Sequence, residues 1–376
     1  PASELRIASD LAAALLRKAL ATGPIPSVKY ALLRMVWWLA FRSQRRDPRM
    51  PKVTIVIPVY NVETYLADAL RSARAQNWPN LELIVVNDGA TDGSAAIIDR
   101  FFYRTRFMRA IVQQNAGLGA ARNAGLAAIE DTDYVMFLDS DDLLPLGSVR
   151  RFVERAESSG SPLVVGKAVC FYGARYFDRT STAAFFSKSH KAISVNDLPE
   201  ILGDATSWNK LYNWQFWQAN HFKFPVGVAY EDMTLVVTAY LAAKQFDVIA
   251  SASYFWRVRA EGESLSKRRT ELKSLQDRLL SMEQIDKILR LATERGFIKP
   301  NVHLSWLSRI VSLDLPLFVE SIPVTDQAFF DELHTRAGKL LENAPEQVWT
   351  QSSGKLRKAV WATVHGNREQ TIKQLS

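Results

Sequence analysis

Three carboxylates lie within four residues, directly after a short apolar run. Tyr134 to Leu138 is a stretch of large and β-branched side chains, and Asp139, Asp141 and Asp142 follow. The apolar run predicts a strand buried on both faces, as in a parallel sheet, with the aspartates just beyond its carboxyl end. Like charges this close repel unless a cation joins them, and carboxylate oxygens favour Mg²⁺ or Mn²⁺ together with substrate phosphates. The alternative is an acidic turn that caps the next helix.

Polar side chains also follow three other predicted strands, over 53–57, 81–86 and 110–113. In a doubly wound sheet the carboxyl ends of the parallel strands meet at one edge, where ligands bind. The polar residues expected to converge there are Tyr60, Asn61, Asp88, Asn115, Gly117, Arg122, Asp139 and Asp141. The sequence therefore predicts a nucleotide-sized crevice at this edge.

The elements that position these residues alternate between strands and amphipathic helices. This pattern predicts βαβ units and an α/β fold with a mostly parallel, Rossmann-like sheet. Helices are expected over 63–76, 93–102, 118–130, 145–158, 196–203, 214–221 and 232–244. Further strands are expected over 163–171 and within 246–259, and 172–195 is expected to be a loop over the site. Beyond about residue 267 the chain is expected to be all-helical, over 270–295, 302–320, 326–343 and 345–365.

These patterns divide the chain into three predicted parts: a helical segment over 1–50, an α/β domain over 51–267 and a helical subdomain over 268–376. In the first part, an apolar, Trp-rich helix over 27–46 is interrupted by Arg34 and is too short to span a bilayer. Two interpretations stay open for this helix. It packs on the rest of the protein, or it lies on an anionic membrane surface.

Composition narrows the class of partner and compartment. The chain is 48% hydrophobic and 23% charged, as globular proteins are, and its net charge of +8 suits nucleotide phosphates, an acidic polymer or a membrane surface. No nucleic-acid partner is expected, because the sequence has no zinc-finger, RNA-recognition or helix-turn-helix signature. The single cysteine, Cys170, fits a reducing compartment, so we expect a cytoplasmic protein, peripheral at the inner face of the plasma membrane. Both ends have the character of fragment boundaries, and a larger parent protein is expected.

Four ordered motifs and two downstream ones resemble those of family-2 inverting glycosyltransferases with the GT-A fold. The four are Ile57-Pro-Val-Tyr-Asn61, Val86-Asn-Asp-Gly-Ala-Thr-Asp-Gly-Ser94, Asn115-Ala-Gly-Leu-Gly-Ala-Ala-Arg-Asn-Ala-Gly125 and Phe137-Leu-Asp-Ser-Asp-Asp142. The downstream pair is Trp208-Asn-Lys-Leu-Tyr212 and Tyr230-Glu-Asp232. The resemblance covers about residues 52–265. It implies a UDP-sugar donor and a divalent cofactor, Mn²⁺ or Mg²⁺.

The resemblance also implies a role for each motif. Asp232 matches the catalytic base, and Asp141, with Asp139, matches the metal site. The implied nucleotide-binding residues are Pro58, Tyr60, Asn61, Asp88, Asn115, Gly117, Arg122, Asp139 and Ser140. Those implied on the acceptor or diphosphate side are Trp208, Asn209, Lys210, Glu231, Arg257, Arg259 and Ser264.

Structural alternatives to these roles stay open. Asp88 is also placed to cap the helix that begins near Gly93, and Arg122 to form a salt bridge with Asp139 or Asp141. Glu231-Asp232 also has the character of an acidic first helical turn.

The predicted function is transfer of a hexosyl or N-acetylhexosaminyl group to a hydroxyl of a cell-wall or capsular glycan, or of a teichoic-acid-like polyol-phosphate acceptor. The C-terminal helices are similar to actinobacterial two-module proteins, in which a family-2 module precedes a teichoic-acid-polymerase-type module. The simpler alternative is a helical subdomain that covers the sheet. Two other functions stay open: a catalytically silent glycan-binding or scaffold module, and a nucleotidyltransferase. The second typically has a Gly-rich basic loop where this chain has Pro58-Val-Tyr-Asn61.

Overall fold

The structure is a computed structural model that describes residues 47, 49–178, 185–259, 268–350 and 354–376. The N-terminal segment 1–46, with the helix predicted over 27–46, lies outside the described residues, so both interpretations of that helix stay open. Ser264 also lies outside them.

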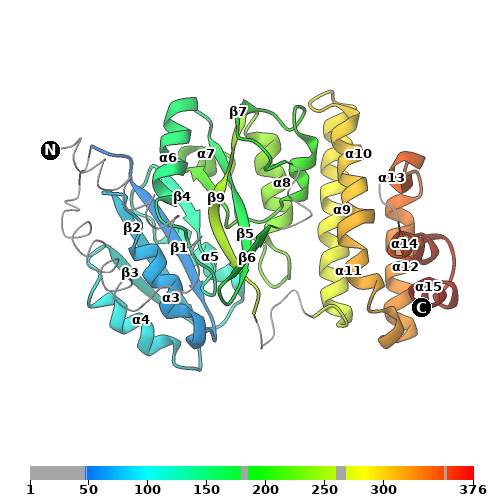
Figure 1. The fold of residues 1–376 in the computed structure, drawn as a ribbon, viewed down its shortest axis with the longest axis horizontal. Helices are drawn as coiled ribbons and strands as arrows, with labels where there is room; N and C mark the ends of the chain where they lie inside the picture. The colour runs from blue at the N-terminus through cyan, green and yellow to red at the C-terminus, as the bar shows by residue number, and fades with distance from the viewer. Residues whose placement is uncertain (1–46, 48, 179–184, 260–267, 351–353) are drawn as a thin grey trace.

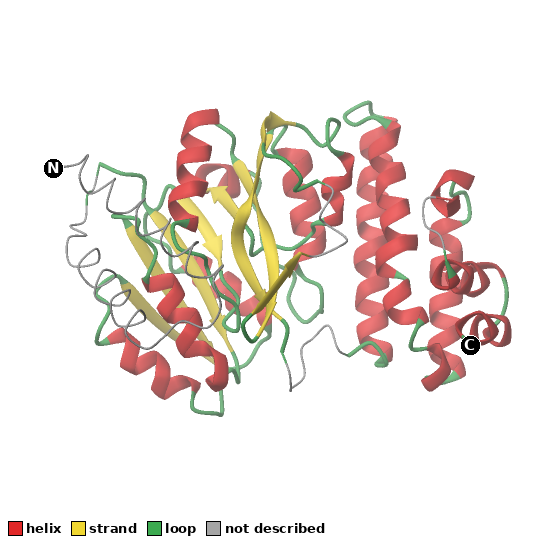
Figure 2. Ribbon diagram, in the orientation of Figure 1, coloured by secondary structure: helices red, strands yellow, loops and turns green. Residues whose placement is uncertain are grey.

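A mixed sheet forms the centre of the α/β part, in the order β3-β2-β1-β4-β8-β5-β9-β7, with β6 paired to β5 (Figure 2). The first four strands in this order are parallel: β3 (Met108–Gln113), β2 (Leu81–Asp88), β1 (Val53–Val59) and β4 (Tyr134–Phe137). Every residue of β1, β2 and β4 is buried, which explains their nearly continuous apolar runs. Their carboxyl ends, with the polar motifs, therefore lie at one edge of the sheet.

The other half of the sheet mixes directions. Its strands are β5 (Leu163–Tyr172), β6 (Arg175–Asp178), β7 (His190–Ile193), β8 (Lys210–Asn213) and β9 (Phe246–Arg257). β8 is antiparallel to both β4 and β5, whereas β9 is parallel to β5. The predicted Rossmann-like, mostly parallel fold is confirmed.

Three strand predictions need correction. The structure adds β8, which was not predicted, and it places β6 and β7 within 172–195, which was expected to be a loop. β1 continues through Pro58, where the strand was expected to end. Because β4 pairs with β1 only as far as Val56, Pro58 lies where one side of β1 has no neighbouring strand, and its missing N–H is tolerated there.

Helices cover the sheet, and α3 and α4 lie side by side along its β1–β3 half (Figure 1). The helices of this part are α3 (Glu63–Arg74), α4 (Ser94–Phe102), α5 (Leu118–Ala127), α6 (Ser148–Ser159), α7 (Trp214–Ala219) and α8 (Asp232–Ala242). The predicted helix over 196–203 is a 3₁₀ helix, Pro199–Gly203. α5 packs closely on β1 because Gly125 has no side chain; a Cβ atom there would lie 2.4 Å from Val56 Cγ1.

The C-terminal part is helical, as predicted. It comprises α9 (Leu272–Glu294), α10 (Pro300–Arg309), α11 (Pro316–Val319), α12 (Gln327–Leu341), α13 (Glu346–Thr350), α14 (Lys355–His365) and α15 (Arg368–Leu375). The predicted single helix over 302–320 is interrupted by a π turn, Ile310–Asp314, because Pro316 cannot continue the α-helical hydrogen bonding. α15 lies beyond the last of the predicted helix ranges but within the part of the chain that was predicted to be all-helical.

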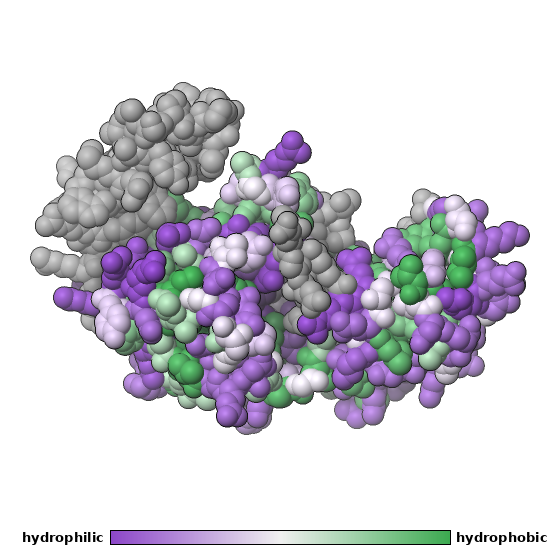
Figure 3. Space-filling view, turned by 90° about the horizontal axis from the view of Figure 1, so that it is seen from below, coloured by the Kyte–Doolittle hydropathy of each residue, from purple (hydrophilic) through white to green (hydrophobic). Residues whose placement is uncertain are grey.

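Buried polar contacts fix these helices to the α/β part. Arg309 on α10 donates to the backbone oxygen of Leu202 and, like Arg278 on α9, pairs with the fully buried Asp314. Among the described residues, one helical stretch, 300–324, is long and apolar enough to cross a membrane, but 56% of its apolar part is buried, as in a core helix. On the face drawn in Figure 3, apolar residues lie scattered among hydrophilic ones.

Candidate active site

Asp88, at the end of β2, holds the loop that precedes α5. Its side chain accepts hydrogen bonds from Gln113 Nε2 at 2.7 Å and from the backbone N–H groups of Ala116 and Gly117, each at 3.0 Å. Asp88 is 2% exposed and does not cap α4, which was the structural alternative. Oδ2 accepts only one of these bonds and can therefore take one more donor, such as a base N–H.

The loops after β1 and β2 are tied together by Asn61. This residue has a left-handed φ of 47°, which asparagine tolerates, and its Oδ1 accepts from the Thr91 backbone N–H at 2.8 Å. Tyr60 beside it is 47% exposed, and Asn115 on the neighbouring loop is also exposed. Pro58 is buried within β1 and packs in the strand, and its predicted nucleotide contact stays a prediction.

Only two of the three clustered aspartates keep partly exposed side chains. Asp142 is 1% exposed; its carboxylate accepts from the Tyr254 hydroxyl at 2.8 Å and from the Arg257 backbone N–H at 2.7 Å. Burial, together with the charges of Asp141 and Asp139, raises the pKa of Asp142 well above its usual range. Asp142 is therefore a structural residue, and Asp139 and Asp141 are left for a ligand. Ser140 between them is buried.

Two arginines from the end of β9 gather beside Asp141. Arg259 Nε donates to Asp141 Oδ2 at 2.7 Å, and Arg257 Nε donates to the Asp141 backbone oxygen at 2.6 Å. Both guanidinium groups lie over the ring of Tyr65 on α3, at 5.1 and 5.3 Å. Burial raises the pKa of Asp141 although Arg259 opposes it. Tyr65 was missed by sequence reasoning, since an aromatic residue on an amphipathic helix is ordinarily a packing residue.

The residues present fit a divalent cation. Asp139 Oδ2 and Asp141 Oδ1 accept no hydrogen bond from the described part of the chain, so each offers a hard oxygen ligand. Mg²⁺ and Mn²⁺ are commonly held by one or two carboxylates and completed by substrate phosphates and water. Within the described residues no group of three or more His, Cys, Asp or Glu side chains is placed to hold an ion, so a diphosphate would have to complete the coordination.

Arg122 joins the end of β4 to the start of α8. It is 1% exposed; Nη2 donates to Asp139 Oδ1 at 2.7 Å, and Nη1 donates to Glu231 Oε1. Its guanidinium lies 5.1 Å from the centre of the Phe224 ring. Burial opposes the charge, but the carboxylates of Asp139 and Glu231 outweigh it and raise the pKa of Arg122. The structure therefore contains the predicted salt bridge to Asp139, which is compatible with a donor contact, and the donor contact of Arg122 stays a prediction.

Asp232 is the first residue of α8 and lies beside this bridge. Its Oδ2 accepts from the Ser207 backbone N–H at 3.2 Å. Burial raises the pKa of Asp232 above its ordinary value, although Arg122 opposes the shift, and burial likewise raises the pKa of Glu231 against the same cation. A carboxylate with a raised pKa is a better proton acceptor. Asp232 thus lies in the acidic first turn of α8, which was the structural alternative, and this position is compatible with its predicted role as the base.

The residue before this pair is held in a strained conformation by α9. Tyr230 has a left-handed φ of 61°, which is unusual for an aromatic residue and costs about 1–3 kcal/mol. Its hydroxyl lies 3.2 Å from Ser274 Oγ, and the Arg278 guanidinium lies 4.5 Å from the centre of its ring. The neighbouring Ala229 backbone N–H donates to Asp277 at 3.0 Å. The C-terminal helices therefore help to position the predicted base.

Helix α5 packs directly against the loop that leads to Asp232. The Asn123 side chain exchanges two hydrogen bonds with the Phe224 backbone, at 2.8 and 3.0 Å. A Cβ atom on Gly119 would lie 2.1 Å from the Pro225 backbone oxygen and 3.3 Å from Glu231 Cγ. Only glycine fits at position 119 without movement of the loop.

Trp208 and Asn209, predicted on the acceptor side, lie in the interior. Trp208 is 6% exposed and stacks on Tyr254 with ring centres 4.3 Å apart. Asn209 is 1% exposed and donates to the Gly166 backbone oxygen at 2.8 Å. Because Asn209 is buried, it has a positioning role in place of the predicted contact with the acceptor.

Lys210 is fully buried and belongs to the same network. Its Nζ donates to Asp204 Oδ1 at 3.1 Å and to Asn209 Oδ1 at 2.8 Å. This network holds the turn whose Ser207 backbone N–H binds Asp232. Lys210 therefore helps to position Asp232 indirectly, in place of the predicted direct contact with the acceptor or the diphosphate. Asp204 was missed because nothing in the sequence pattern pairs it with a lysine six residues later.

Comparisons with known proteins agree with this geometry. Residues 54–216 match the family model described as Glycosyl transferase family 2. Glycosyltransferase GlyA of Streptococcus pneumoniae is 32% identical over 217 residues, which cover 55% of this chain and 31% of GlyA. Poly(ribitol-phosphate) beta-N-acetylglucosaminyltransferase TarS of Staphylococcus aureus is 24% identical over 316 residues, which cover 82% of this chain and 52% of TarS. The chain thus spans between about a third and about half of the length of these two relatives.

Solved structures share the fold. Staphylococcus aureus TarS 1–349 in complex with UDP matches with a TM-score of 0.66 and 20% identity, covering 86% of this chain and 90% of that chain. Mannosyltransferase PcManGT from Pyrobaculum calidifontis, in complex with GDP-Man and Mn²⁺, matches with a TM-score of 0.51 and 16% identity, covering 99% of both chains. Residues 54–216 of this chain therefore match glycosyltransferase family 2, and the solved glycosyltransferase structures share its fold.

Proposed function

We propose that this chain transfers a sugar from a UDP-sugar to a hydroxyl group of an anionic polyol-phosphate or glycan acceptor, by a single displacement with inversion. The observation that carries the proposal is the bridge formed by Arg122, which binds Asp139 at the end of β4 and Glu231 next to Asp232. Through this bridge, the strand-end carboxylates and a candidate base share one site.

The donor would lie across the ends of β2, β1 and β4. Two strand spacings separate β2 from β4, or about 10 Å, which is the scale of a nucleoside diphosphate. Asp88 offers an acceptor for the base at one end, and Arg257 and Arg259 offer positive charge for the diphosphate at the other. Asp139 and Asp141 would hold Mn²⁺ or Mg²⁺, which when bound neutralises charge on the leaving diphosphate.

Asp232 would take the proton of the acceptor hydroxyl. The acceptor oxygen forms a bond to the anomeric carbon as the bond from that carbon to the diphosphate oxygen breaks, and the nucleoside diphosphate leaves. General-base assistance of this kind is worth about 10²–10⁴ in rate. Burial raises the pKa of Asp232, and the buried positive charge of Arg122 opposes that rise.

The acceptor class is supported by chemistry and by one relative. A net charge of +8 favours a polyanion, and TarS is named for action on poly(ribitol-phosphate). A location at the inner face of the plasma membrane, and a second catalytic module in a longer parent chain, belong to the same proposal.

A thermal-shift panel of nucleotides and nucleotide sugars, with and without Mn²⁺, tests the proposal. We expect UDP and UDP-sugars to raise the melting temperature more than other nucleotides, because a ligand at 100 times its Kd stabilises the folded state by about 2.7 kcal/mol. Asp141→Ala should remove the Mn²⁺-dependent part of the shift. No response to any nucleotide would refute the proposal. Slow hydrolysis of the donor in Mn²⁺ would separate an enzyme from a silent glycan-binding module.

A further inference from the structure

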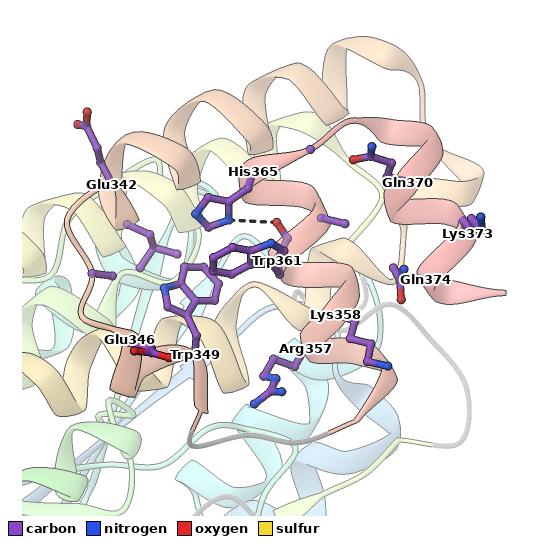
Figure 4. A pocket seen from close by; sticks show the side chains of 14 residues that line it. Glu342, Glu346, Trp349, Arg357, Lys358, Trp361, His365, Gln370, Lys373 and Gln374 are labelled. Atoms are coloured by element: carbon purple, nitrogen blue, oxygen red, sulfur yellow. Dashed lines mark hydrogen bonds between the residues drawn. The ribbon is translucent and has the colours of Figure 1, made fainter.

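A cavity of about 900 Å³ lies within the C-terminal helices (Figure 4). The helices that line it stand apart from the sheet (Figure 1). This volume is within the range of small-ligand sites. Its wall comes from α12 to α15 and the turns between them. The side chains on which the inference rests are Trp349, Trp361, His365, Arg357, Lys358 and Lys373.

Three aromatic rings form one wall of the cavity (Figure 4). His365 stacks on Trp361 with ring centres 3.7 Å apart, and Trp349 stands nearly perpendicular, 4.8 Å from Trp361 and 5.1 Å from His365. If Trp349 covered the face of Trp361 opposite to His365, the ring centres of Trp349 and His365 would lie apart by nearly the sum of 3.7 and 4.8 Å. The observed distance is much shorter, so Trp349 lies beside the stack.

His365 therefore covers one face of Trp361. The opposite face of Trp361 is covered by neither His365 nor Trp349. Trp361 is 47% exposed, whereas Trp349 beside it is 9% exposed. The face of an indole is electron-rich, and the C–H bonds on one face of a sugar ring carry partial positive charge, so the two stack well. This arrangement is suited to holding a sugar ring.

Positive charge borders the aromatic wall. No ion pair joins Arg357, Lys358 or Lys373 to a carboxylate anywhere in the part of the chain that the structure describes. The cavity wall also carries Glu342 and Glu346, so its net charge is positive. Figure 4 shows Arg357 and Lys358 together at the start of α14, next to Trp361. Unpaired arginine and lysine side chains are the usual ligands of phosphate groups.

We propose that this cavity is a second binding site for the polymer acceptor, where a sugar substituent stacks on Trp361 and the adjoining phosphodiester binds Arg357 and Lys358. The identity of the ligand rests on the proposed function; the aromatic and basic character of the cavity does not. A second site on the same chain keeps a polymer at high effective concentration near the catalytic site between transfers. The site would therefore favour long, already substituted acceptors over short ones.

The test uses the full chain and two synthetic probes, a glycerol-phosphate decamer with glucosyl substituents and the same decamer without them. Binding is measured by calorimetry for the wild type, Trp361→Ala, Trp361→Phe and Arg357→Gln/Lys358→Gln. We expect Trp361→Ala to weaken binding of the substituted decamer at least tenfold and Trp361→Phe to restore part of it. The double variant should weaken both decamers and reduce their salt dependence. Phe297→Ala, which changes an aromatic residue that is 71% exposed outside both sites, is the matched control and should bind normally.

Turnover measurements distinguish a failure of the second binding site from a failure of the proposed glycosyltransferase function. Trp361→Ala should keep the wild-type kcat on a single-unit acceptor and raise KM for the decamer. Unchanged decamer binding in folded Trp361→Ala would overturn the second site alone. Binding that depends on Trp361 without any sugar transfer by the wild type would support the cavity and refute the enzyme. A change from dimer to monomer in Trp361→Ala, with no effect on the decamer, would show instead that the cavity joins two copies of the chain.

Discussion

Replacing Gly119 with alanine should slow sugar transfer and leave nucleotide binding intact. The new Cβ atom would lie 2.1 Å from the Pro225 backbone oxygen, so the loop must move by more than about 1 Å to reach ordinary contact distance. This loop continues into Asp232, and a misplacement of about 1 Å in a reacting group can cost about 10²-fold in rate. The clash should cost about 1–3 kcal/mol of stability, which the better helix propensity of alanine offsets by about 1 kcal/mol. The melting temperature should therefore fall by only a few degrees.

The assay compares kcat, from release of UDP, with the Kd for UDP measured by calorimetry in Mn²⁺. Gly119→Ala should lower kcat by about 10²-fold and change Kd by less than about threefold, because Asp88 and Asp141 lie outside the displaced loop. Gly338→Ala is the matched control. Gly338 is also helical, and its Cβ atom would meet nothing closer than the Val364 oxygen at 3.6 Å, so turnover should be normal. A folded Gly119→Ala variant with wild-type kcat would refute the reasoning.

Three further predictions concern buried charges. Arg122→Met leaves two carboxylates without their cation and should lower the free energy of unfolding by about 3–5 kcal/mol in urea titrations; a loss below about 1 kcal/mol would contradict the bridge. Lys210→Met should destabilise the fold similarly and lower kcat more than donor affinity, and an unchanged kcat would argue against its positioning role. Burial tends to raise the pKa of Asp314, but Arg278 and Arg309 outweigh burial and hold it below its usual range. Its stabilisation is therefore complete above the ordinary pKa of about 3.9 and is lost as pH falls through the lowered value, so Asp314→Asn should flatten the acid limb of stability against pH.

The parallel half of the fold could be predicted because its strands carry their own signal. β1, β2 and β4 are buried on both faces and are therefore nearly continuous apolar runs in the sequence. β8 carries no such signal: it is four residues long and is defined by antiparallel pairing to β4 and β5, which are distant in the sequence. Its existence depends on tertiary contacts that periodicity does not report.

The candidate site also has features that the sequence predicts and features that depend on tertiary contacts. Motif spacing predicted that the strand-end aspartates would lie at one edge, but spacing does not report exposure. Asn209 and Lys210 were expected to meet the acceptor because they are polar, whereas both are buried around Asp204. The clash that requires glycine at position 119 and the contact of two arginines with the ring of Tyr65 are also tertiary features. Each needs the backbone path of a second segment, which no local pattern contains.

The central claim is that Asp232 removes the acceptor proton beside a nucleotide bound at Asp88 and Asp141. The most direct measurement is the turnover of Asp232→Asn set against its affinity for UDP in Mn²⁺, because asparagine keeps the shape of the side chain and loses its basicity. We predict that kcat falls by about 10²–10⁴-fold while Kd for UDP stays within about threefold of the wild type. Turnover close to that of the wild type would contradict the assignment of the base and with it the proposed mechanism.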